Sequence, residues 1–474
     1  MGSEGGKGGA HECYHLYIRR LGARRGTRSR PGKGARKGVR GRVGGRLKED
    51  IAAGRAALAV IGLGYVGVPL AAAAARSGLE VTGLDLNPRL VSELKRGRHE
   101  SRDVAREELL SLMRAGRLRI TSDPGELAGC DAFCICVPTP LTPQREPVLD
   151  HIREAADMVA DALKRRRGRE SLVVLESTSF PGTTHEEVLP RLLRSGASLC
   201  EGFHLAFSPE RIDPGNPVWR LDNTPKLVGG ERRCCSTAAS ALYRRFVDRV
   251  VTVSSPAAAE MAKVLENVYR AVNIALVNEL WMLCERMGLD VWEVIEAAST
   301  KPFGFQAFRP GPGLGGHCIP VDPFYLAYKA REFDFQTEFV ELAGKINASM
   351  PYFVADLARR ALDRAGRSVK GSHVLLLGMS YKAGVGDTRN SPSLKVMKLL
   401  RDDGAKVGYH DPFVPEVLVG GKAARSLPLT AARLKATDLV IVLTDHPGVD
   451  YDLVRESGVL LLDTRNVTGR RPRR

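Results

Sequence analysis

The chain has 474 residues, which is too long for one hydrophobic core and implies two or three domains. Its 43% hydrophobic and 26% charged residues are ordinary for a globular protein, and it has no run of about 18 apolar residues, so no membrane partner is expected. The nine cysteines include no Cys-x2-Cys pair, which predicts reduced thiols, no metal and a cytoplasmic location.

The net charge of +17 is concentrated near the amino terminus. Residues 1–50 carry 14 Lys and Arg against 4 Asp and Glu, with few large apolar side chains. Such a segment buries too little surface to offset chain entropy, so residues 1–50 are predicted to be a disordered basic segment. Two origins fit it: a basic arm for RNA or another anionic surface, or non-native sequence from a misplaced translation start. A nucleic-acid-binding protein is kept as a distant alternative function, although nucleic acid is not the expected main partner.

A glycine-rich turn follows the first apolar run of the predicted folded part. The expected elements are a strand at Ala56–Ile61, a helix at Pro69–Ser77 and a second strand at Glu80–Leu84. Gly62 permits a tight turn, Gly64 lets a pyrophosphate approach the backbone, and Gly67 lets the helix pack closely. Asp85 follows the second strand, where a carboxylate binds the adenosine ribose, so NAD is predicted rather than NADP. The predicted cofactor contacts of this unit are Gly62, Gly64, Tyr65, Val66, Gly67, Asp85 and, near the adenine, Arg89.

Strands and helices continue to alternate after this unit. Strands are expected at Ala132–Val137 and Leu172–Glu176, with helices from about Asp150 to Arg166 and from about Thr184. This alternation predicts a mostly parallel, doubly wound sheet, in which ligands bind beyond the carboxyl ends of the strands. Polar segments occur at such ends at residues 136–140, 176–178 and 207–211. For each segment alone, a turn or capping role fits as well as a functional one.

A long helix is predicted from Pro256 to Met287. Proline suits a first helical turn, and apolar residues recur at helical spacing, which gives a broad apolar stripe. A helix of this length commonly bridges two domains, and its apolar flank predicts a homodimer interface. Lys263 and Asn267 are an i, i+4 pair and therefore share one face of the helix. Taken alone, these two side chains are better explained as part of a solvated face.

A second α/β unit is predicted to begin at Ser372. Strands are expected at His373–Leu377, Lys406–His410, Leu439–Leu443 and Val459–Asp463, with a helix at Ser393–Asp403. Lys382 follows the first of these strands and is a candidate phosphate contact, although a solvated lysine is the simpler interpretation. The predicted fold class is therefore α/β, with two Rossmann-like doubly wound domains joined by a long central helix.

A glycine-rich loop carries the most unusual cysteine. Four glycines occur between Gly311 and Gly316, Cys318 follows them, and Asp322 lies four residues further on. Glycine costs about 1 kcal/mol in a helix interior, so this cluster indicates backbone that turns sharply or approaches a ligand. A thiol in that setting is a candidate nucleophile. Taken alone, Cys318 is more simply interpreted as a small buried hydrophobe.

Together these segments resemble the UDP-glucose/GDP-mannose dehydrogenase family over about residues 55–467. The stretches that carry the resemblance are residues 136–142, 176–184 and 207–215 and Gly311–Tyr325. They are most similar to the UDP-N-acetylglucosamine 6-dehydrogenases, but UDP-N-acetylmannosamine dehydrogenases share much of the pattern, and UDP-glucose is a further alternative substrate. The resemblance implies an NAD-dependent oxidoreductase that converts the C6 alcohol of a UDP-sugar to a carboxylate, a step that usually serves polysaccharide biosynthesis.

The resemblance also implies a mechanism and a set of site residues. The Cys318 thiolate attacks an intermediate aldehyde, and the thiohemiacetal is oxidised to a thioester that is then hydrolysed. The implied catalytic residues are Cys318, Lys263, Asn267, Asp322, Glu210 and Thr139. The implied additional cofactor contacts are Thr139, Glu176 and Arg389, and the implied substrate contacts are Glu210, Lys263, Asn267, Arg309, Gly315 and Lys382. The implied domains are an NAD-binding Rossmann domain (51–250), a central helical dimerisation domain (251–350) and a UDP-sugar-binding Rossmann-like domain (351–474).

Each catalytic residue has an implied role. Lys263 stabilises the oxyanion, with Asn267 beside it as a hydrogen-bonding partner. Glu210 is the acid/base of thioester hydrolysis, and Thr139 holds a water or the C6 oxygen. Asp322 orients water or Lys263.

Overall fold

The computed structural model describes residues 46–99, 101, 103–142, 144, 146–166, 168–213, 216, 218–316, 319 and 321–469. Residues 1–45 and Cys318 lie outside this part of the chain, so the predictions about them stay predictions. The disordered segment was predicted to reach residue 50, but helix α2 (Arg46–Ala52) already begins at Arg46. Leu47 and Ile51, one helical turn apart, are buried in the core of the first domain and fix this helix.

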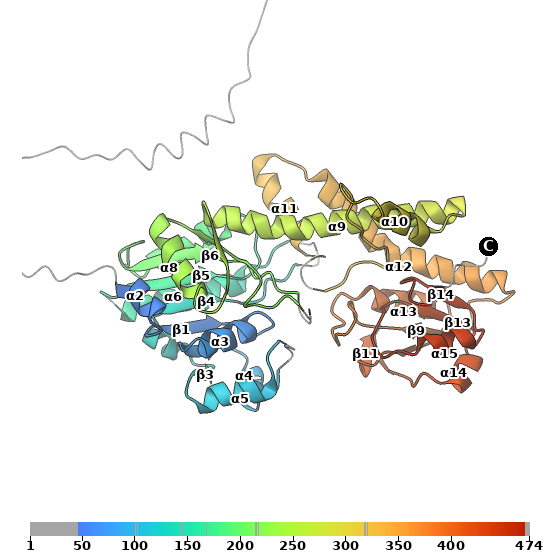
Figure 1. The fold of residues 1–474 in the computed structure, drawn as a ribbon, viewed down its shortest axis with the longest axis horizontal. Coiled ribbons are helices and arrows are strands. Elements are labelled where there is room, and N and C mark those ends of the chain that lie inside the picture. The colour runs from blue at the N-terminus through green and yellow to red at the C-terminus, as the bar shows by residue number, and fades with distance from the viewer. Residues whose placement is uncertain are drawn as a thin grey trace, which may run out of the picture. The chain divides into compact units, whose positions relative to one another are not determined.

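The first domain is built on an eight-stranded sheet (Figure 1). Its strands are β1 (Ala57–Ile61), β2 (Glu80–Leu84), β3 (Leu118–Thr121), β4 (Ala132–Ile135), β5 (Ser171–Leu175), β6 (Phe203–Phe207), β7 (Lys226–Gly230) and β8 (Val250–Val253). Their order is β3-β2-β1-β4-β5-β6-β7-β8, and neighbours are parallel except for β6 with β7. The mostly parallel sheet is confirmed, although the sequence prediction missed β3, β7 and β8.

Helices cover both faces of this sheet. They are α3 (Gly67–Arg76), α4 (Pro88–Lys95), α5 (Arg106–Arg114), α6 (Asp150–Arg165), α7 (Leu189–Leu193) and α8 (Arg233–Tyr243), with short turns η1 (Pro124–Gly129) and η2 (Thr184–Val188). Side chains alternate along β1: Leu58 and Val60 join the core shared with α3 and α8, while Ala59 and Ile61 join the core shared with α6. The predicted doubly wound arrangement is therefore confirmed.

A central helical region follows the first sheet. Helix α9 (Pro256–Met287) has the predicted bounds: the Ser255 hydroxyl accepts a hydrogen bond from the Ala258 N–H at its start, and Gly288 ends it with φ 70°. The other helices are α10 (Val291–Ser299), α11 (Asp322–Ala330), η3 (Arg331–Phe333) and α12 (Glu338–Arg364). Helix α12, which the sequence prediction missed, packs along α9 (Figure 1). Among the described helices, none is both long and apolar enough to cross a membrane.

The last domain has a smaller, all-parallel sheet. Its strands are β9 (His373–Leu377), β10 (Lys406–His410), β13 (Leu439–Val442) and β14 (Leu461–Asp463), in the order β10-β9-β13-β14. An antiparallel hairpin, β11 (Glu416–Val419) with β12 (Lys422–Arg425), and helices α13 (Pro392–Asp402), α14 (Ala431–Lys435) and α15 (Tyr451–Glu456) complete it. One of its two cores continues into α9, α10 and α12, so the central helices and this domain share a core.

One expectation about the cysteines is wrong. Cys200 and Cys234 form a disulfide, whereas reduced thiols were predicted throughout. The two residues are 34 positions apart, in a turn before β6 and at the start of α8, so no local spacing revealed the pair. The described cysteines with free thiols are Cys130, Cys134, Cys136, Cys235 and Cys284.

Candidate active site

The glycine turn between β1 and α3 has the shape that a dinucleotide requires. Gly62 has φ 91°, and a Cβ added there would lie 2.7 Å from the Cys136 carbonyl oxygen. A Cβ on Gly67 would lie 1.8 Å from the Gly62 carbonyl oxygen, so neither position tolerates a side chain. At Gly64, by contrast, an added Cβ would meet no atom within 4 Å. The open space therefore lies at the position where the pyrophosphate is predicted to approach the backbone.

Asp85 is held rigidly beside this turn. Its carboxylate accepts hydrogen bonds from the Leu63 N–H (3.0 Å) and the Asn87 N–H (2.9 Å). The carboxylate therefore joins the end of β2 to the glycine turn, where it is placed to bind a ribose. Arg89 is exposed in the first turn of α4, next to the same strand end. These residues fit the predicted NAD.

A residue of the last domain contacts this cofactor region. The Arg389 guanidinium carbon lies 4.7 Å from the centre of the Tyr65 ring, within the range of a cation–π contact. Arg389 also pairs with Asp387, at Nε to Oδ1 2.9 Å and Nη2 to Oδ2 2.8 Å, which fixes the guanidinium. The geometry agrees with the predicted reach of Arg389 towards the cofactor, and that contact itself stays a prediction.

A buried ionic unit lies at the carboxyl ends of β5 and β6. Lys226 Nζ on β7 contacts Glu176 Oε2 (2.7 Å) and Glu210 Oε2 (3.0 Å), and the Tyr243 hydroxyl donates to Glu176 Oε1 at 2.6 Å. Glu176 is 1% exposed and its carboxylate is engaged by Lys226 and Tyr243. The predicted contact of Glu176 with the cofactor is untested, and its side chain is held inside the protein. Sequence reasoning missed Lys226 and Tyr243, because their partners are distant in the chain.

The pKa values of the two carboxyl groups in this unit shift in opposite directions. Burial would raise the pKa of Glu210, but attraction to Lys226 and hydrogen bonds from Lys226 and the Ile212 backbone outweigh it, so the pKa of Glu210 falls below its ordinary value. Burial raises the pKa of Glu176 despite the opposing charge of Lys226. Burial lowers the pKa of Lys226, but the two carboxylates outweigh it and hold that pKa above its ordinary value. The lowered pKa favours the ionised form of Glu210, which is the form of a carboxylate that can accept a proton.

Helix α9 brings Lys263 and Asn267 to the start of α11. Both side chains are buried, and the Asn267 amide donates to Asp322 Oδ2 while Arg270 donates to Asn267 Oδ1. The solvated-face interpretation of this pair is therefore wrong. Burial raises the pKa of Asp322 to about 6, against the lowering effects of the Lys263 charge and the Asn267 hydrogen bond.

The charge of Lys263 also acts on Glu210 in the ionic unit. It lowers the pKa of Glu210, although less than Lys226 does, so one cation acts on both Glu210 and Asp322. Thr139 joins the group through its carbonyl oxygen, which accepts a hydrogen bond from the Tyr325 hydroxyl on α11 at 2.7 Å. The structure therefore brings together Glu210, Lys263, Asn267 and Asp322, which are four of the six predicted catalytic residues, and it joins the backbone of Thr139 to α11.

A relay of buried amides anchors the glycine loop that precedes Cys318. The Gly311 N–H donates to Asn278 Oδ1 (2.9 Å), and the Asn278 amide donates to Asn347 Oδ1 (2.9 Å). The Asn347 amide donates in turn to the Ala271 carbonyl oxygen (2.9 Å). The start of the loop is thus fixed to both α9 and α12, and sequence spacing gave no sign of this relay.

The end of the same loop is held by the last domain. A Cβ on Gly315 would lie 2.4 Å from Tyr381 Cβ, so only glycine fits there. The Gly316 N–H donates to the Arg389 carbonyl oxygen (3.1 Å), and the Asn390 amide donates to the Gly316 carbonyl oxygen (3.1 Å). The loop that leads to Cys318 therefore connects the central helices with the last domain.

The other predicted substrate contacts lie at the edge of this group. Lys382 Nζ forms an ion pair with Asp213 Oδ1, which joins the last domain to the loop after β6. Arg309 is exposed in the segment before Gly311, so its predicted contact with the substrate stays a prediction.

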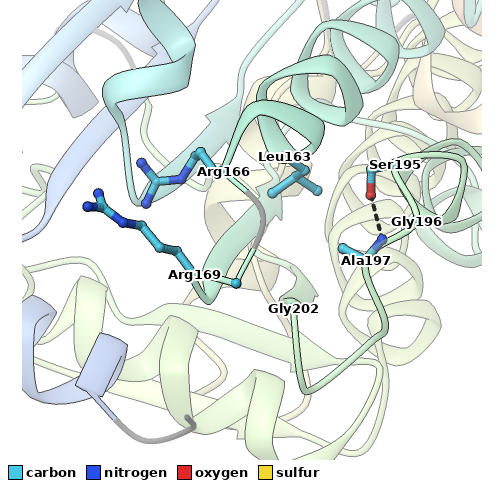
Figure 2. A pocket seen from close by; sticks show the side chains of 8 residues that line it. Leu163, Arg166, Arg169, Ser195, Gly196, Ala197 and Gly202 are labelled. Carbon is cyan, nitrogen blue, oxygen red and sulfur yellow. Dashed lines mark hydrogen bonds between the residues drawn. The ribbon is translucent and has the colours of Figure 1, made fainter. Parts of the chain in front are cut away.

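A hollow of about 420 Å³ lies elsewhere in the first domain (Figure 2). It is lined by Leu163, Arg166, Gly168, Arg169, Ser195, Gly196, Ala197 and Gly202. Arg166 there pairs with Asp131 and donates to the Ala128 carbonyl oxygen at 3.2 Å. None of the predicted site residues lines this hollow, so the group described above does not depend on it.

Three family models match consecutive parts of the chain. All describe the UDP-glucose/GDP-mannose dehydrogenase family: its NAD binding domain matches residues 56–247, its central domain residues 257–349 and its UDP binding domain residues 375–470. The chain is 35% identical over 419 residues to a UDP-N-acetyl-D-mannosamine dehydrogenase of Pyrococcus horikoshii, covering 86% of this chain and 95% of the relative. It is also 35% identical over 391 residues to a UDP-N-acetyl-D-glucosamine 6-dehydrogenase of Salmonella typhi, covering 82% and 89%.

Solved structures of nucleotide-sugar dehydrogenases are also similar to this chain. The UDP-N-acetyl-D-mannosamine dehydrogenase of Pyrococcus horikoshii superposes with a TM-score of 0.77 at 32% identity, covering 86% of this chain and 99% of that structure. A UDP-glucose dehydrogenase of Pyrobaculum islandicum also has a TM-score of 0.77, at 29% identity, and covers 86% and 94%.

Proposed function

Since the chain belongs to the UDP-glucose/GDP-mannose dehydrogenase family, we propose that it oxidises the C6 alcohol of UDP-N-acetylglucosamine to the carboxylate. It is an NAD-dependent nucleotide-sugar dehydrogenase, and its substrate is a UDP-sugar. The N-acetylated sugar is supported by relatives whose names specify N-acetylated sugars: mannosamine, glucosamine and galactosaminuronic acid. UDP-N-acetylmannosamine is the nearest alternative, and UDP-glucose a more distant one.

The proposed chemistry starts with the alcohol. NAD⁺, when bound, accepts one hydride in each of the two oxidations. In the first oxidation the C6 carbon loses a hydride, and the hydroxyl proton passes to water held at Thr139 and Asp322, which gives an aldehyde. The Cys318 thiolate then attacks the aldehyde carbon and forms a C–S bond, so the reactive aldehyde cannot diffuse away.

The covalent intermediate completes the reaction. Its alkoxide collapses with loss of a second hydride and becomes a thioester. Glu210 then takes a proton from water, the resulting hydroxide attacks the thioester carbon, and the thiolate leaves as the C–S bond breaks. The juxtaposition of Lys263, Asn267 and Asp322 carries this proposal, because a buried ammonium and an amide can stabilise the oxyanion of both the thiohemiacetal and the hydrolytic intermediate.

A panel of UDP-sugars tests the proposed substrate. We expect NADH production and a 6-carboxylated product, identified by mass spectrometry, with kcat/KM highest for UDP-N-acetylglucosamine. The panel includes the N-acetylmannosamine, N-acetylgalactosamine and glucose nucleotides, which differ at C2 or C4. A higher kcat/KM for UDP-glucose than for every N-acetylated sugar would contradict the proposal, and a product that stops at the aldehyde would contradict the proposed chemistry.

The proposal includes a homodimer formed through α9. Large apolar side chains are exposed along one face of this helix: Met261, Leu265, Tyr269, Leu276, Leu280, Leu283 and Met287. They recur at intervals of three, four and seven residues and so form one continuous stripe. A stripe of this length on two copies related by a twofold axis can bury itself against its own equivalent. The cytoplasmic location expected from the sequence is part of the same proposal, because the charged nucleotide substrates do not cross membranes unaided.

A further inference from the structure

A cluster of metal-ligand side chains lies in the first domain, away from the active site. Cys200, His204, Cys234 and Cys235 place one ligand atom each so that all four lie within 4.8 Å of one another. Cys200 precedes β6, His204 is on β6, and the two other cysteines are at the start of α8. The sequence gave no sign of this cluster, because Cys200 is 34 residues from Cys234 and the two lie in different parts of the fold.

Two of the three spacings between the sulfur atoms fit a tetrahedral metal ion, and the third belongs to the Cys200–Cys234 disulfide. Cys235 Sγ lies 3.8 Å from Cys200 Sγ and 3.9 Å from Cys234 Sγ. Zinc–sulfur bonds are about 2.3 Å, so two sulfurs at the corners of a tetrahedron around zinc are separated by about 3.8 Å. Both distances from Cys235 have this value.

His204 provides an independent indication. The residue is 7% exposed, and its Nδ1 atom has no hydrogen-bond partner, although a buried polar atom normally has one. A metal ion would satisfy this nitrogen.

The disulfide between Cys200 and Cys234 involves only two of the four residues of the cluster. It explains neither the third sulfur at contact distance from both partners nor the buried imidazole with an unsatisfied nitrogen. Both features are explained if the thiol form of the same residues holds a metal.

We propose that the reduced chain binds one Zn²⁺ ion through Cys200, His204, Cys234 and Cys235. Three thiols lose their protons to solvent as three sulfur–zinc bonds and one nitrogen–zinc bond form, and no electron is transferred. Starting from the disulfide, a dithiol reductant must first supply two electrons. Four protein ligands leave no open position, so the site is structural.

The place of the site supports this structural role. The cluster joins the amino end of β6 to the start of α8, whereas Glu210 lies beyond the carboxyl end of β6. A strand of this length separates the two ends by roughly 15 Å. The zinc would therefore fix the strand and helix that position the ionic unit without contacting the reacting groups.

The full-length chain, purified with a dithiol reductant and dialysed, tests the proposal by its metal content. We expect about one zinc per chain by mass spectrometry of the elements. After exchange with Co²⁺, we expect visible d–d bands of a tetrahedral site and a near-ultraviolet thiolate-to-cobalt absorption. Reduced protein that retains no zinc and shows neither absorption would overturn the proposal.

Matched variants localise the metal. Cys235→Ala removes a ligand but leaves Cys200 and Cys234 able to form their disulfide, and Cys284→Ala removes a buried thiol elsewhere. We expect the zinc of Cys235→Ala to fall to near zero and that of Cys284→Ala to stay at the level of the parent protein. Equal zinc in both variants would overturn the assignment. Should Cys235→Ala fail to fold, the cobalt spectrum of the parent protein still decides whether thiolates bind the metal.

Discussion

At the scale of single residues, the site depends on charges that are buried together. Lys226 lies between Glu176 and Glu210, and Lys263 acts on both Glu210 and Asp322. Each cation lowers the pKa of carboxyl groups whose pKa burial raises. The sequence could indicate Glu210 and Lys263 because both lie in family motifs. Lys226 lies in no such motif, and its role becomes visible only where β7 brings it beside the ends of β5 and β6.

Replacing Lys226 by methionine should destabilise the protein by about 3–5 kcal/mol, because two carboxylates would remain buried without their cation. Denaturant unfolding of the parent and Lys226→Met proteins measures this change. Adding Glu176→Gln to Lys226→Met should restore part of the loss, since one of the uncompensated charges is then removed. A loss of less than about 1 kcal/mol in the single variant would show that the unit is solvated rather than buried.

The acid limb of the pH profile should report Asp322. Burial raises its folded pKa to about 6, so the carboxylate is protonated below that pH and loses its attraction to Lys263. We therefore expect kcat/KM to rise between about pH 5 and pH 7 as Asp322 ionises. Asp322→Asn should lower kcat/KM and remove this limb from the remaining activity, whereas the exposed Asp334→Asn should leave the limb unchanged. A limb near pH 6 that persists in Asp322→Asn would assign it to another group.

At the scale of elements, helix α9 and the glycine turn were predictable because their signals are local. A proline start, a glycine end and regular apolar spacing define α9, and three glycines with strict steric roles define the turn. Helix α12, strand β7 and the Cys200–Cys234 pair were missed because long-range packing decides them. Pro351 within α12 also obscured that helix, since proline normally marks a helix end.

The apolar stripe on α9 predicts a dimer that a single charge should disrupt. Leu276 is 53% exposed at the middle of the stripe, and Leu276→Glu would bury a carboxylate in the proposed interface. We expect this variant to elute as a monomer in light-scattering chromatography, at concentrations where the parent protein is a dimer. Leu418→Glu, at an exposed leucine on β11, is the control and should remain dimeric. A parent protein that is monomeric, or a Leu276→Glu protein that remains a dimer, would contradict the interface.

The amide relay predicts that α9 positions the glycine loop. Asn278→Ala would leave the Gly311 N–H and the side-chain Oδ1 of Asn347 unpaired, at a cost of about 1–3 kcal/mol for each buried group. We expect a lower unfolding midpoint together with a lower kcat, because the loop that carries Cys318 would be less fixed. Asn273→Ala, on the same helix, is the matched control, since its amide donates to the Tyr269 carbonyl oxygen of α9 itself. If the two variants unfold at the same denaturant concentration, the relay has no anchoring role.

At the scale of the whole molecule, the candidate site takes residues from all three domains. The glycine turn and the ionic unit come from the first domain, Lys263 and Asp322 from the central helices, and the contacts to Gly315 and Gly316 from the last domain. The family motifs are contiguous, so the sequence could indicate candidate site residues, and their roles stay predictions. The pairing of Arg389 with Tyr65 and of Lys382 with Asp213 depends on how distant segments meet, and no local pattern encodes it.

The stoichiometry of NADH tests the central claim, a double oxidation through Cys318, most directly. With limiting UDP-N-acetylglucosamine and excess NAD⁺, the parent protein should form about two NADH per sugar, because alcohol and aldehyde are both oxidised on one active site. Cys318→Ala should lose the covalent second oxidation and fall well below two. A Cys318→Ala protein that still forms two NADH per sugar at the parent rate would contradict the account.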